Sequence, residues 1–585
     1  MHIFRHEREP TTVGRLLERM AAAAAARQGL DLLLASAQLE CGLSDGSLRA
    51  SGAEEAGAAR AGLLAFSQRA ASYYLALGPL PDPAAWGELR GWAGPAGQAL
   101  SLSAPEGLRY YALEPAGYAQ AARQWRHDHP GTPAWVIGLR SMGSLLAPVV
   151  AAALAPPGAV ALVPPGAAAR APEGAEARVP QSAEALAPPG AEEIVPRGAA
   201  AWPPDGAAPR LLTLRPRGAP DDRTIAAGRA LEAAIRRWPG AFLIVDEGPG
   251  LSGSSFGGTV AWLAGLGVAT ERTGLFPSWV PAPGQLSNVY AARAWPRWRC
   301  YAAPLLAAPA GATAELSAGR WRRHWRPASP TPVWPQQERR KYLADGGRTL
   351  VKFAGFGPYQ RQTLECAARL AHAGWAPPLA PEPIGEPGWI RYRTLSARPL
   401  PPRPGRRWCE WAGAYLAWRR LELVRGAARP PSATLQEMVR LNAHRLLPHR
   451  PPPPDPDPDA LAAAPVAVDG RLQRGEWGLG PGGFVKFDAT DHADDPFFPG
   501  PCDIAWDLAA MGIEFGAPHQ AAVVAAYCRH TGETPARLAL RLAWHRHAYA
   551  LFRAAFARFA ATQAPAADAA AFIRQSRRYL AALKQ

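Results

Sequence analysis

Two adjacent carboxylates followed by a turn of small residues form the stretch of this sequence best suited to chemistry. In AFLIVDEGPGLSGSSFGG, residues 241–258, Asp246 and Glu247 follow an apolar run, and nearly all later residues are Gly, Ser or Pro. Backbone N–H groups and hydroxyls without bulky side chains form a phosphate site, to which a helix amino terminus adds partial positive charge. The two acids would repel that phosphate, so we expect them to face sugar hydroxyls or Mg2+. A ribose 5-phosphate unit meets both requirements.

The elements that position these residues alternate between strand and helix. Strand-like runs are expected at 133–139, 210–216, 241–247 and 269–277, and helix-like runs at 144–154, 223–238 and 257–267. Strict alternation is typical of an α/β fold with a parallel sheet, whose ligands lie at the carboxyl ends of the strands. The loop GLRSMGS, residues 138–144, and the loop after Asp246 and Glu247 would both lie at that edge.

The segment FLIVDEGPGLSGSSF resembles the 5-phosphoribosyl-1-pyrophosphate signature of type I phosphoribosyltransferases. That signature has four apolar residues, two acids, a spacer and a Thr-Gly-x-Thr turn, which is Ser252-Gly253-Ser254-Ser255 here. The resemblance covers about residues 130–280. It implies a Mg2+-dependent enzyme in which an acceptor displaces pyrophosphate from C1 of the ribose. The acceptor is not predicted.

The resemblance also implies roles for particular residues. Asp246 and Glu247 would bind the ribose hydroxyls, and the 5′-phosphate would be bound by Gly250, Ser252, Gly253, Ser254 and Ser255. VIGLRSMGS matches the pyrophosphate loop of the family, with Arg140, Ser141 and Gly143 at the matching positions. TLRPRGAPDDR, residues 213–223, lies where the family has a mobile catalytic loop, so Arg215 and Arg217 would stabilise the departing pyrophosphate.

The sequence departs from this family at two positions, and other interpretations remain. Glu247 stands where many members have a second Asp, and Pro249 stiffens the entry to the turn. The two acids could instead cap a strand beside a tight turn. A fold of this kind could also be kept for binding or regulation without transfer.

A second group of residues suggests nucleotide binding in the second half of the chain. The hairpin KYLADGGRTLVKF, residues 341–353, has a glycine turn at Gly346-Gly347 and ends near Lys352, and the following helix carries Glu365. In kinases a strand lysine binds the nucleotide phosphates and a helix glutamate holds that lysine. The sequence therefore predicts ATP binding by Lys352, with Glu365 as its partner.

Residues 469–509 resemble the catalytic region of aminoglycoside phosphotransferase-like kinases, a resemblance that extends over about residues 335–585. PGPCDIAWDLA matches the last element of that region, and Asp488, or else Asp491, would be the metal-binding carboxylate. The catalytic loop DGRLQRGE puts Arg471 in the place of the catalytic Asp and Glu476 in the place of the Asn. Either Asp469 substitutes from a shifted position, or the domain binds nucleotide without ordinary kinase activity.

The chain of 585 residues is long enough for several domains. We expect an α/β protein: a phosphoribosyltransferase-like domain with a parallel sheet and an N-terminal helical region at 1–325, a linker at 326–340, and an α+β two-lobed kinase-like domain at 341–585. Repeated Pro-Gly-Ala units predict a flexible insertion at 154–210.

The amino-acid composition limits the classes of partner that we expect for this chain. The net charge of +16 comes from Arg spread along the chain, which favours anionic small molecules over nucleic acid. The six cysteines include no C-x-x-C pair, so no structural metal is implied. No apolar run approaches the about 20 residues of a membrane span, and no secretory signal is recognised, so we expect a cytoplasmic protein. The oligomeric state is not predicted.

Three functional hypotheses follow. The first is a bifunctional or regulated enzyme that uses 5-phosphoribosyl-1-pyrophosphate, Mg2+ and ATP. The second is a sensing module in which both sites bind ligands without turnover, for which Arg471 is the best support. The third is an RNA-associated regulator, which only the net charge supports.

Overall fold

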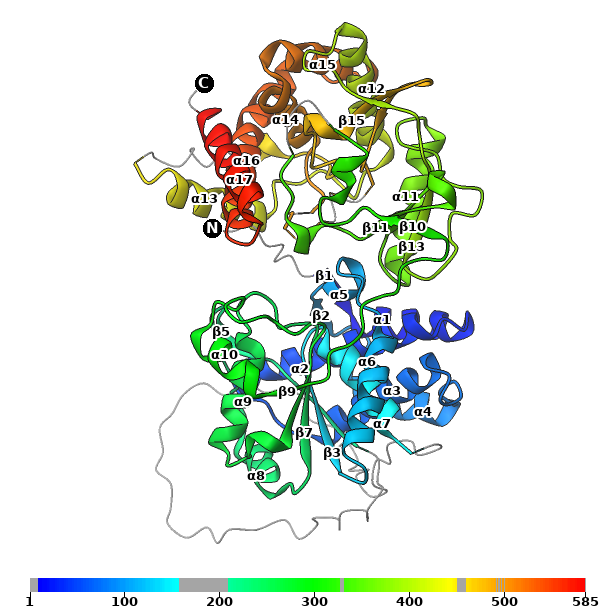
Figure 1. Ribbon diagram of the computed structural model, residues 1–585, viewed down its shortest axis with the longest axis vertical. Coiled ribbons are helices and arrows are strands. Elements are labelled where there is room, and N and C mark those ends of the chain that lie inside the picture. The colour runs from blue at the N-terminus through cyan, green and yellow to red at the C-terminus, as the bar shows by residue number, and fades with distance from the viewer. Residues whose placement is uncertain are drawn as a thin grey trace. The chain divides into compact units, whose positions relative to one another are not determined.

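The computed structural model describes residues 9–156, 209–326, 331–449, 459–490 and 500–583, together with residues 492, 495, 497 and 498. The expected insertion at 154–210 lies almost wholly outside the described residues, and so does Asp491. The chain forms two compact units (Figure 1). The parallel-sheet unit comprises Pro10–Leu102 and Pro115–Pro304, and the two-lobed unit comprises Ser103–Glu114 and Leu305–Gln585.

Five parallel strands form the centre of the parallel-sheet unit, in the order β4-β3-β7-β8-β9. Their bounds are β3 (Ala134–Leu139), β4 (Arg210–Leu214), β7 (Ala241–Val245), β8 (Thr273–Phe276) and β9 (Arg299–Cys300). Every residue of β3, β7 and β8 is buried, as expected for a parallel sheet that helices cover on both faces. The expected parallel sheet is confirmed.

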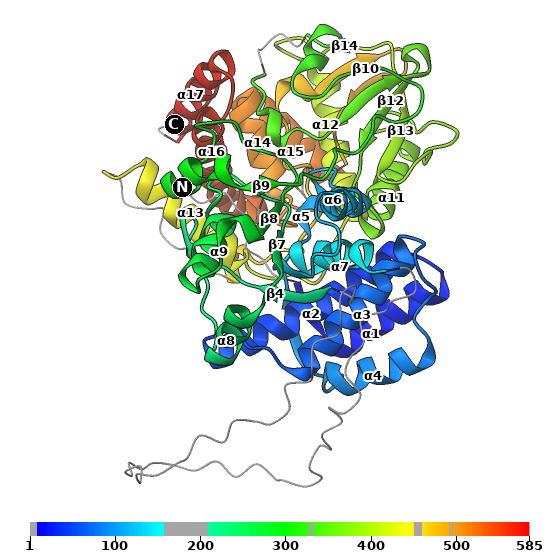
Figure 2. The ribbon, with the colours of Figure 1, turned by 60° about the horizontal axis from the view of Figure 1, so that its bottom comes forward.

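Helices cover both faces of this sheet. They are α1 (Val13–Ala25), α2 (Gly29–Ser51), α3 (Ala58–Tyr74), α4 (Pro83–Ala93), α6 (Pro115–Asp128), α7 (Gly143–Leu154), α8 (Arg229–Arg237), α9 (Ser254–Gly265) and α10 (Val289–Ala294). Trp135, Ile137 and Leu139 alternate along β3 and share one core with side chains of α8 and α9. On the other face α6 packs on α7, and the N-terminal helices α2 and α3 pack on α7 in turn (Figure 2).

The strand order places a topological switch point between β3 and β7. The first strand of the sheet, β3, lies between the second strand, β4, and the third, β7. The chain therefore winds in opposite directions from this point, which opens a crevice at the carboxyl ends of the two strands. Gly143 passes so close to β7 that a Cβ atom there would lie 2.9 Å from the Val245 carbonyl oxygen. The loops after β3 and β7 are thus direct neighbours.

The helix expected over 223–238 begins only at Arg229. Residues before it form a hairpin of β5 (Arg217–Ala219) and β6 (Asp222–Thr224). The backbone of Glu54 accounts for the difference, because its N–H donates to Ala226 and its carbonyl accepts from Gly228, over 2.7 and 2.8 Å. These tertiary hydrogen bonds hold 226–228 extended. A short strand β2 (Ala99–Leu102) pairs with β1 (Glu9–Thr12).

The two-lobed unit begins with an antiparallel sheet in the order β10-β11-β12-β13. This lobe contains β10 (Ala312–Glu315), β11 (Lys341–Ala344), β12 (Thr349–Phe353), β13 (Trp389–Arg393), α5 (Glu106–Arg109) and α11 (Pro358–His372). The amide of Phe356, just before α11, donates to the Leu108 carbonyl of α5 over 3.0 Å. The segment Ser103–Glu114 therefore packs on this lobe, although the residues on both sides of it belong to the other unit.

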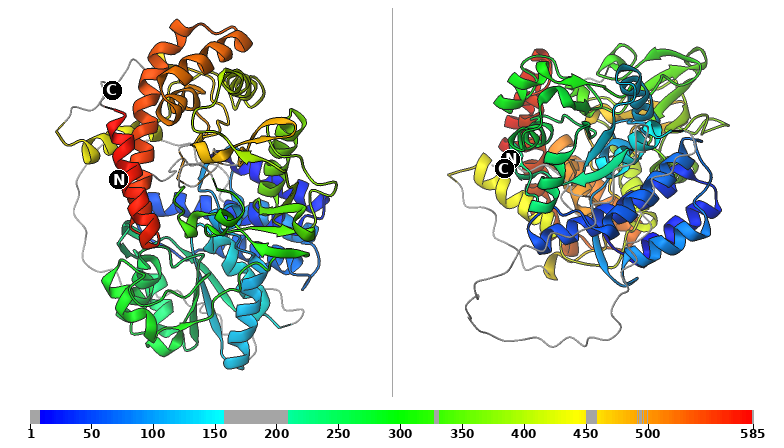
Figure 3. Two further views of the ribbon diagram at one scale, coloured as in Figure 1. Left: turned by 45° about the horizontal axis from the view of Figure 1, so that its top comes forward. Right: turned by 90° about the horizontal axis from the view of Figure 1, so that it is seen from below.

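Helices dominate the second lobe. Its elements are α12 (Arg406–Glu422), α13 (Ala433–Leu446), α14 (Ala505–Phe515), α15 (Ala517–Thr531), α16 (Pro535–Ala561), α17 (Ala566–Ala581) and the small sheet β14 (Arg398–Pro399), β15 (Trp477–Gly480) and β16 (Gly483–Lys486). The two last helices, α16 and α17, lie side by side (Figure 3). Single helical turns occur at η1 (Thr270–Arg272), η2 (Trp295–Arg297), η3 (Arg320–Arg323), η4 (Pro335–Gln337), η5 (Asp345–Gly347), η6 (Asp459–Leu461) and η7 (Arg474–Glu476).

The segment expected as a linker, 326–340, connects two adjacent strands of one sheet. Residues Ala312 and Glu315 of β10 pair with Ala344 and Tyr342 of β11, on the other side of this segment. Trp334 within it is 3% exposed and belongs to the core of the helical lobe. Among the described helices of both units, none combines the length and apolar character needed to cross a bilayer.

Candidate functional site

The switch point of the parallel sheet brings together the residues that the sequence singled out in the first half. Arg140, Ser141 and Gly143 follow β3, and Asp246 and Glu247 follow β7. After the small-residue turn, α9 begins at Ser254. The predicted acids and the predicted pyrophosphate loop therefore lie at the same edge of the sheet.

The backbone of Asp246 is held on both sides. Its N–H donates to the Phe276 carbonyl over 3.3 Å, and its carbonyl accepts from the Tyr118 hydroxyl of α6 over 2.8 Å. Burial raises the pKa of the Asp246 carboxyl to about 7. The Glu247 backbone N–H and the Arg215 guanidinium lower this pKa, but burial has the larger effect. The Asp246 and Glu247 side chains remain partly exposed. Two carboxylates are thus presented from a fixed backbone.

The small-residue turn is covered by the tip of the β5–β6 hairpin. The hydroxyls of Ser252 and Ser254 both donate to the Pro220 carbonyl, over 2.9 and 2.6 Å. Beside them, Asp221 accepts hydrogen bonds from Ser287 and from the Asn288 side chain. The hydroxyls predicted to bind a phosphate thus donate to a backbone carbonyl in this conformation. Gly250 is exposed, Ser255 is partly exposed, and Gly253 is buried.

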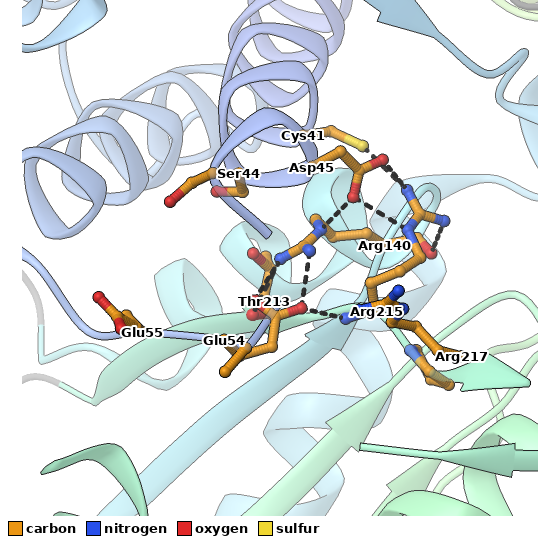
Figure 4. A network of polar contacts seen from close by, with 12 residues as sticks. Cys41, Ser44, Asp45, Glu54, Glu55, Arg140, Thr213, Arg215 and Arg217 are labelled. Carbon is orange, nitrogen blue, oxygen red and sulfur yellow. Dashed lines mark hydrogen bonds and ion pairs between the residues drawn. The ribbon is translucent and has the colours of Figure 1, made fainter. Parts of the chain in front are cut away.

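Arg140 and Arg215, expected to contact pyrophosphate, are bound to acids of the same unit (Figure 4). Arg140 donates to Asp45 over 2.9 Å and to both carboxylate oxygens of Glu54 over 2.7 and 3.0 Å. Arg215 donates to the two oxygens of Asp45 over 3.1 and 2.7 Å, and its amide donates to Glu54 over 2.8 Å. The acids belong to α2 and to the chain just after it.

The network is balanced in charge and almost entirely buried. Three acids, Glu40, Asp45 and Glu54, face three arginines, Arg60, Arg140 and Arg215. Glu40 also accepts from the hydroxyls of Ser44, Ser144 and Thr213. The Arg140 side chain has no exposed surface, whereas that of Arg215 is 21% exposed. The Arg140 backbone is engaged as well, because its N–H donates to the Leu214 carbonyl over 2.8 Å and its carbonyl accepts from the Arg215 guanidinium over 2.5 Å.

Arg217 differs from both. It is exposed at the start of β5, where its guanidinium donates to the Gly52 carbonyl over 3.2 Å. Of the two arginines predicted for this loop, Arg217 is the more exposed.

Sequence reasoning did not identify Glu54, Asp45 or Tyr118 as site residues. Asp45 lies in a polar run of α2, LECGLSDGS, whose buried Glu40 and Asp45 are unusual for a helix interior. That run of acids in an apolar helix was a usable signal. Tyr118 gave none, because a tyrosine on an amphipathic helix is ordinary core composition.

In the two-lobed unit, Lys352 of β12 binds Asp488, which follows β16. The ammonium group and the carboxylate form an ion pair, with the two side chains 11% and 33% exposed. Asp488 has a left-handed backbone conformation with φ of 57°, which is uncommon outside glycine and aims its carboxylate at Lys352. Burial opposes ionisation, but Lys352 and His492 hold the pKa of Asp488 well below its ordinary value. The lysine and the metal-binding carboxylate predicted from the sequence are thus brought together.

Glu365 is not the partner of Lys352. It lies on an exposed face of α11, and no ion pair joins it to Lys352 in the described residues. Asp488 fills that role instead. Asp491 lies outside the described residues.

The loop at 469–476 is held by buried hydrogen bonds. Asp507 of α14 accepts from the amides of Asp469 and Gly470 over 2.7 and 3.0 Å. The Asp469 carboxylate is fully buried and accepts from the Tyr415 hydroxyl over 2.6 Å. Burial opposes ionisation of Asp469, but Lys486, His492 and Arg419 keep its pKa below the ordinary value. Asp469 is therefore a structural anion without exposed surface for an acceptor.

Arg471, in the expected place of a catalytic base, lies among acids. Its guanidinium is 3.7 Å from Asp495 and 3.9 Å from Glu476. A guanidinium stays protonated and cannot accept a proton from an acceptor hydroxyl. Neither the guanidinium of Arg471 nor the buried carboxylate of Asp469 is placed as an ordinary general base.

Neither a family model nor a curated protein sequence matches the chain. Solved structures do share a likeness with about two fifths of it. A macrolide 2′-phosphotransferase type I is 18% identical, with 41% of this chain and 86% of that chain covered and a TM-score of 0.28. Choline kinase LicA from Streptococcus pneumoniae is 15% identical, with 42% and 89% covered and a TM-score of 0.29. A choline/ethanolamine kinase family protein from Mesorhizobium loti is 18% identical, with 42% and 88% covered and a TM-score of 0.27.

Proposed function

We propose that the parallel-sheet unit binds 5-phosphoribosyl-1-pyrophosphate and transfers its phosphoribosyl group to an acceptor. One observation carries this proposal: Asp246 and Glu247 directly follow β7 at the topological switch point of the sheet, and the Ser252 and Ser254 hydroxyls follow in the same loop, at the start of α9. The carboxylates suit the ribose hydroxyls, and the hydroxyls with the α9 amino terminus suit the 5′-phosphate.

The chemistry needs orientation more than a covalent nucleophile. The bond from C1 to the pyrophosphate oxygen breaks, a bond from C1 to the acceptor forms, and pyrophosphate leaves with the electron pair. The partly exposed carboxylates of Asp246 and Glu247 would stabilise the positive charge that develops on the sugar. Bound Mg2+ would neutralise the pyrophosphate. The hairpin would have to move from Ser252 and Ser254 to admit the phosphate.

Calorimetric titration tests this directly. 5-Phosphoribosyl-1-pyrophosphate is titrated with and without Mg2+ into the full chain and into Asp246→Asn, with Asp128→Asn as a control because Asp128 is exposed at the end of α6. We expect Mg2+-dependent binding that Asp246→Asn loses and Asp128→Asn keeps. No binding to the wild type would refute the proposal. Binding without pyrophosphate release for any acceptor tried would favour a sensing module.

We further propose that the two-lobed unit binds ATP and Mg2+ through Lys352 and Asp488. The ion pair between these residues supports this second function. The nucleotide phosphates would replace Asp488 as the partner of the Lys352 ammonium. The Asp488 carboxylate would then bind the metal. Arg471 in place of a base favours nucleotide binding over ordinary transfer to a hydroxyl.

Titration of ATP into the wild type and into Lys352→Met tests whether the two-lobed unit binds nucleotide. A search for phosphorylated product tests whether it also transfers phosphate. Mg2+-dependent binding that Lys352→Met loses would support a nucleotide site, and phosphorylated product would show activity. RNA binding that falls steeply with salt, with no response to either phosphate ligand, would favour the third hypothesis.

A further inference from the structure

Lys486, the last residue of β16, has a fully buried side chain in the two-lobed unit. Its ammonium group donates to the Phe487 carbonyl over 2.8 Å and to Glu476 Oε2 over 3.0 Å. It also lies 3.3 Å from Asp469 Oδ1. An ammonium has three N–H donors, and here three oxygens surround it. The ring of Trp477, 5.5 Å away, lies on another side.

The same oxygens belong to a donor set with the spacing of a metal site. Asp469, Glu476 and His492 each offer one ligand atom, and these atoms lie within 4.8 Å of one another. His492 Nδ1 is buried without a hydrogen-bond partner and lies 3.6 Å from Asp469 Oδ1 and 3.9 Å from Glu476 Oε2. Carboxylates with one imidazole are suitable ligands for a divalent cation.

Lys486 already provides positive charge at this place. A divalent ion bound by Asp469 and Glu476 would share their oxygens with an ammonium that has no exposed route of escape. Like charges at contact distance in a buried site repel strongly. Removing the ammonium would instead leave the buried Asp469 carboxylate, the 14% exposed Glu476 carboxylate and His492 as an unfilled donor set, which a metal ion can stabilise.

We propose that Lys486 is a built-in cation that replaces a divalent metal ion at Asp469, Glu476 and His492. The proposed function places a metal at Asp488, whose carboxylate lies 3.5 Å from His492 Nε2, whereas Lys486 lies against Asp469 and Glu476, near the Nδ1 atom of His492. This inference rests on the contacts of Lys486 and holds whether or not Asp488 binds metal. Within the described residues, the Asp469, Glu476 and His492 set would then hold the fixed ammonium in place of a divalent ion.

Metal rescue of Lys486→Ala in the full chain tests the proposal. We expect the variant to melt at a lower temperature than the wild type, because the buried Asp469 carboxylate and the 14% exposed Glu476 carboxylate lose their nearest cation. Arg419 remains at 3.7 Å from Asp469, and Arg471 remains at 3.9 Å from Glu476. Millimolar Mn2+ should raise its melting temperature by about 5 °C or more, with little change in the wild type. Electron paramagnetic resonance should count one more bound Mn2+ per chain in the variant than in the wild type.

Two further variants complete the test. Lys486→Ala combined with Glu476→Gln removes a metal ligand, so the Mn2+ rescue should disappear. Glu476→Gln alone should leave Mn2+ binding to the otherwise wild-type chain unchanged. This comparison remains decisive if Lys486→Ala fails to fold, because weaker Mn2+ binding in Glu476→Gln would make Glu476 a metal ligand and overturn the proposal. Absence of rescue in a folded Lys486→Ala would overturn it as well. If Asp488 does not bind a metal ion, Asp488→Asn will leave Mn2+ binding unchanged. This outcome is separate from the test of Lys486.

Discussion

The hydroxyl of Tyr118 donates to the main-chain carbonyl of Asp246 over 2.8 Å. Tyr118 is completely buried on α6, and Asp246 is the first residue after β7. The bond therefore fixes the point at which the carboxylate-bearing loop leaves the sheet, from a helix on one face of that sheet. In the proposed function, this bond would support the two carboxylates from behind.

Tyr118→Phe removes this bond and leaves the ring in place. We expect a loss of about 1–3 kcal/mol in the free energy of unfolding, because the Asp246 carbonyl is left without its donor. Binding of 5-phosphoribosyl-1-pyrophosphate should weaken as well, since the loop loses its anchor. Urea unfolding and calorimetry measure the two effects. Tyr290→Phe, at a 50% exposed tyrosine of α10, is the control and should change neither. Unchanged affinity in a destabilised Tyr118→Phe would show that the bond supports the fold alone.

The pH dependence of stability should report the ionisation of Asp246. Burial raises the pKa of its carboxyl to about 7. Between the ordinary aspartate value and about pH 7, the folded chain retains a proton that the unfolded chain has released. The contribution of Asp246 to stability is therefore fully present at low pH and is lost as the pH rises to about 7.

Asp246→Asn should remove that contribution. The difference in unfolding free energy between the wild type and Asp246→Asn should change steadily from about pH 4 to 7, with a slope of at most about 1.4 kcal/mol per pH unit. The unfolding free energies of the two proteins have to be subtracted at each pH, because Glu106 and Asp507 also titrate in this range in both proteins. Burial is the chief cause that raises the pKa of each of these carboxyls to about 7. A difference that is flat over this range would mean that Asp246 is ionised throughout.

The buried ion pairs of Arg140 predict a large effect on folding. Arg140→Ala would leave Asp45 and Glu54 short of positive charge in a buried network, which costs about 3–5 kcal/mol. Arg217→Ala removes an exposed arginine and should change the unfolding free energy by less than about 0.5 kcal/mol. If Arg217 contacts pyrophosphate, its variant should lower the rate of transfer without lowering stability. Denaturant unfolding beside pyrophosphate release distinguishes the two roles.

The sequence predicted the parallel sheet and the meeting of the loops after β3 and β7, because apolar strands and small-residue loops are local patterns. It did not predict the environment of Arg140, since the partners Asp45 and Glu54 are 95 and 86 residues away. Nor did the sequence indicate that the helix expected at 223–238 begins only at Arg229. Hydrogen bonds with the distant Glu54 backbone hold the preceding residues extended. Long-range polar pairing leaves little trace in one sequence, whereas periodic burial leaves a strong one.

Substitution of Glu365 should leave nucleotide binding unchanged, whereas substitution of Asp488 should change it. Glu365 is exposed on α11 and no ion pair of the described residues joins it to Lys352, so Glu365→Gln should leave ATP affinity unchanged within about twofold, as for most surface substitutions. Asp488→Asn should abolish the Mg2+ dependence of ATP binding, because the carboxylate beside Lys352 is lost. Titration of ATP with and without Mg2+ measures both.

Glu365→Gln also distinguishes two states of Lys352. A drop in ATP affinity of tenfold or more would mean that Lys352 leaves Asp488 and pairs with Glu365 when the nucleotide binds, and that the ion pair seen here belongs to the free protein alone. Equal affinity in Glu365→Gln and the wild type would mean that the phosphates draw Lys352 from Asp488 without help from α11. Loss of affinity in Asp488→Asn with Mg2+ absent would contradict a metal role and make Asp488 a positioning residue for Lys352.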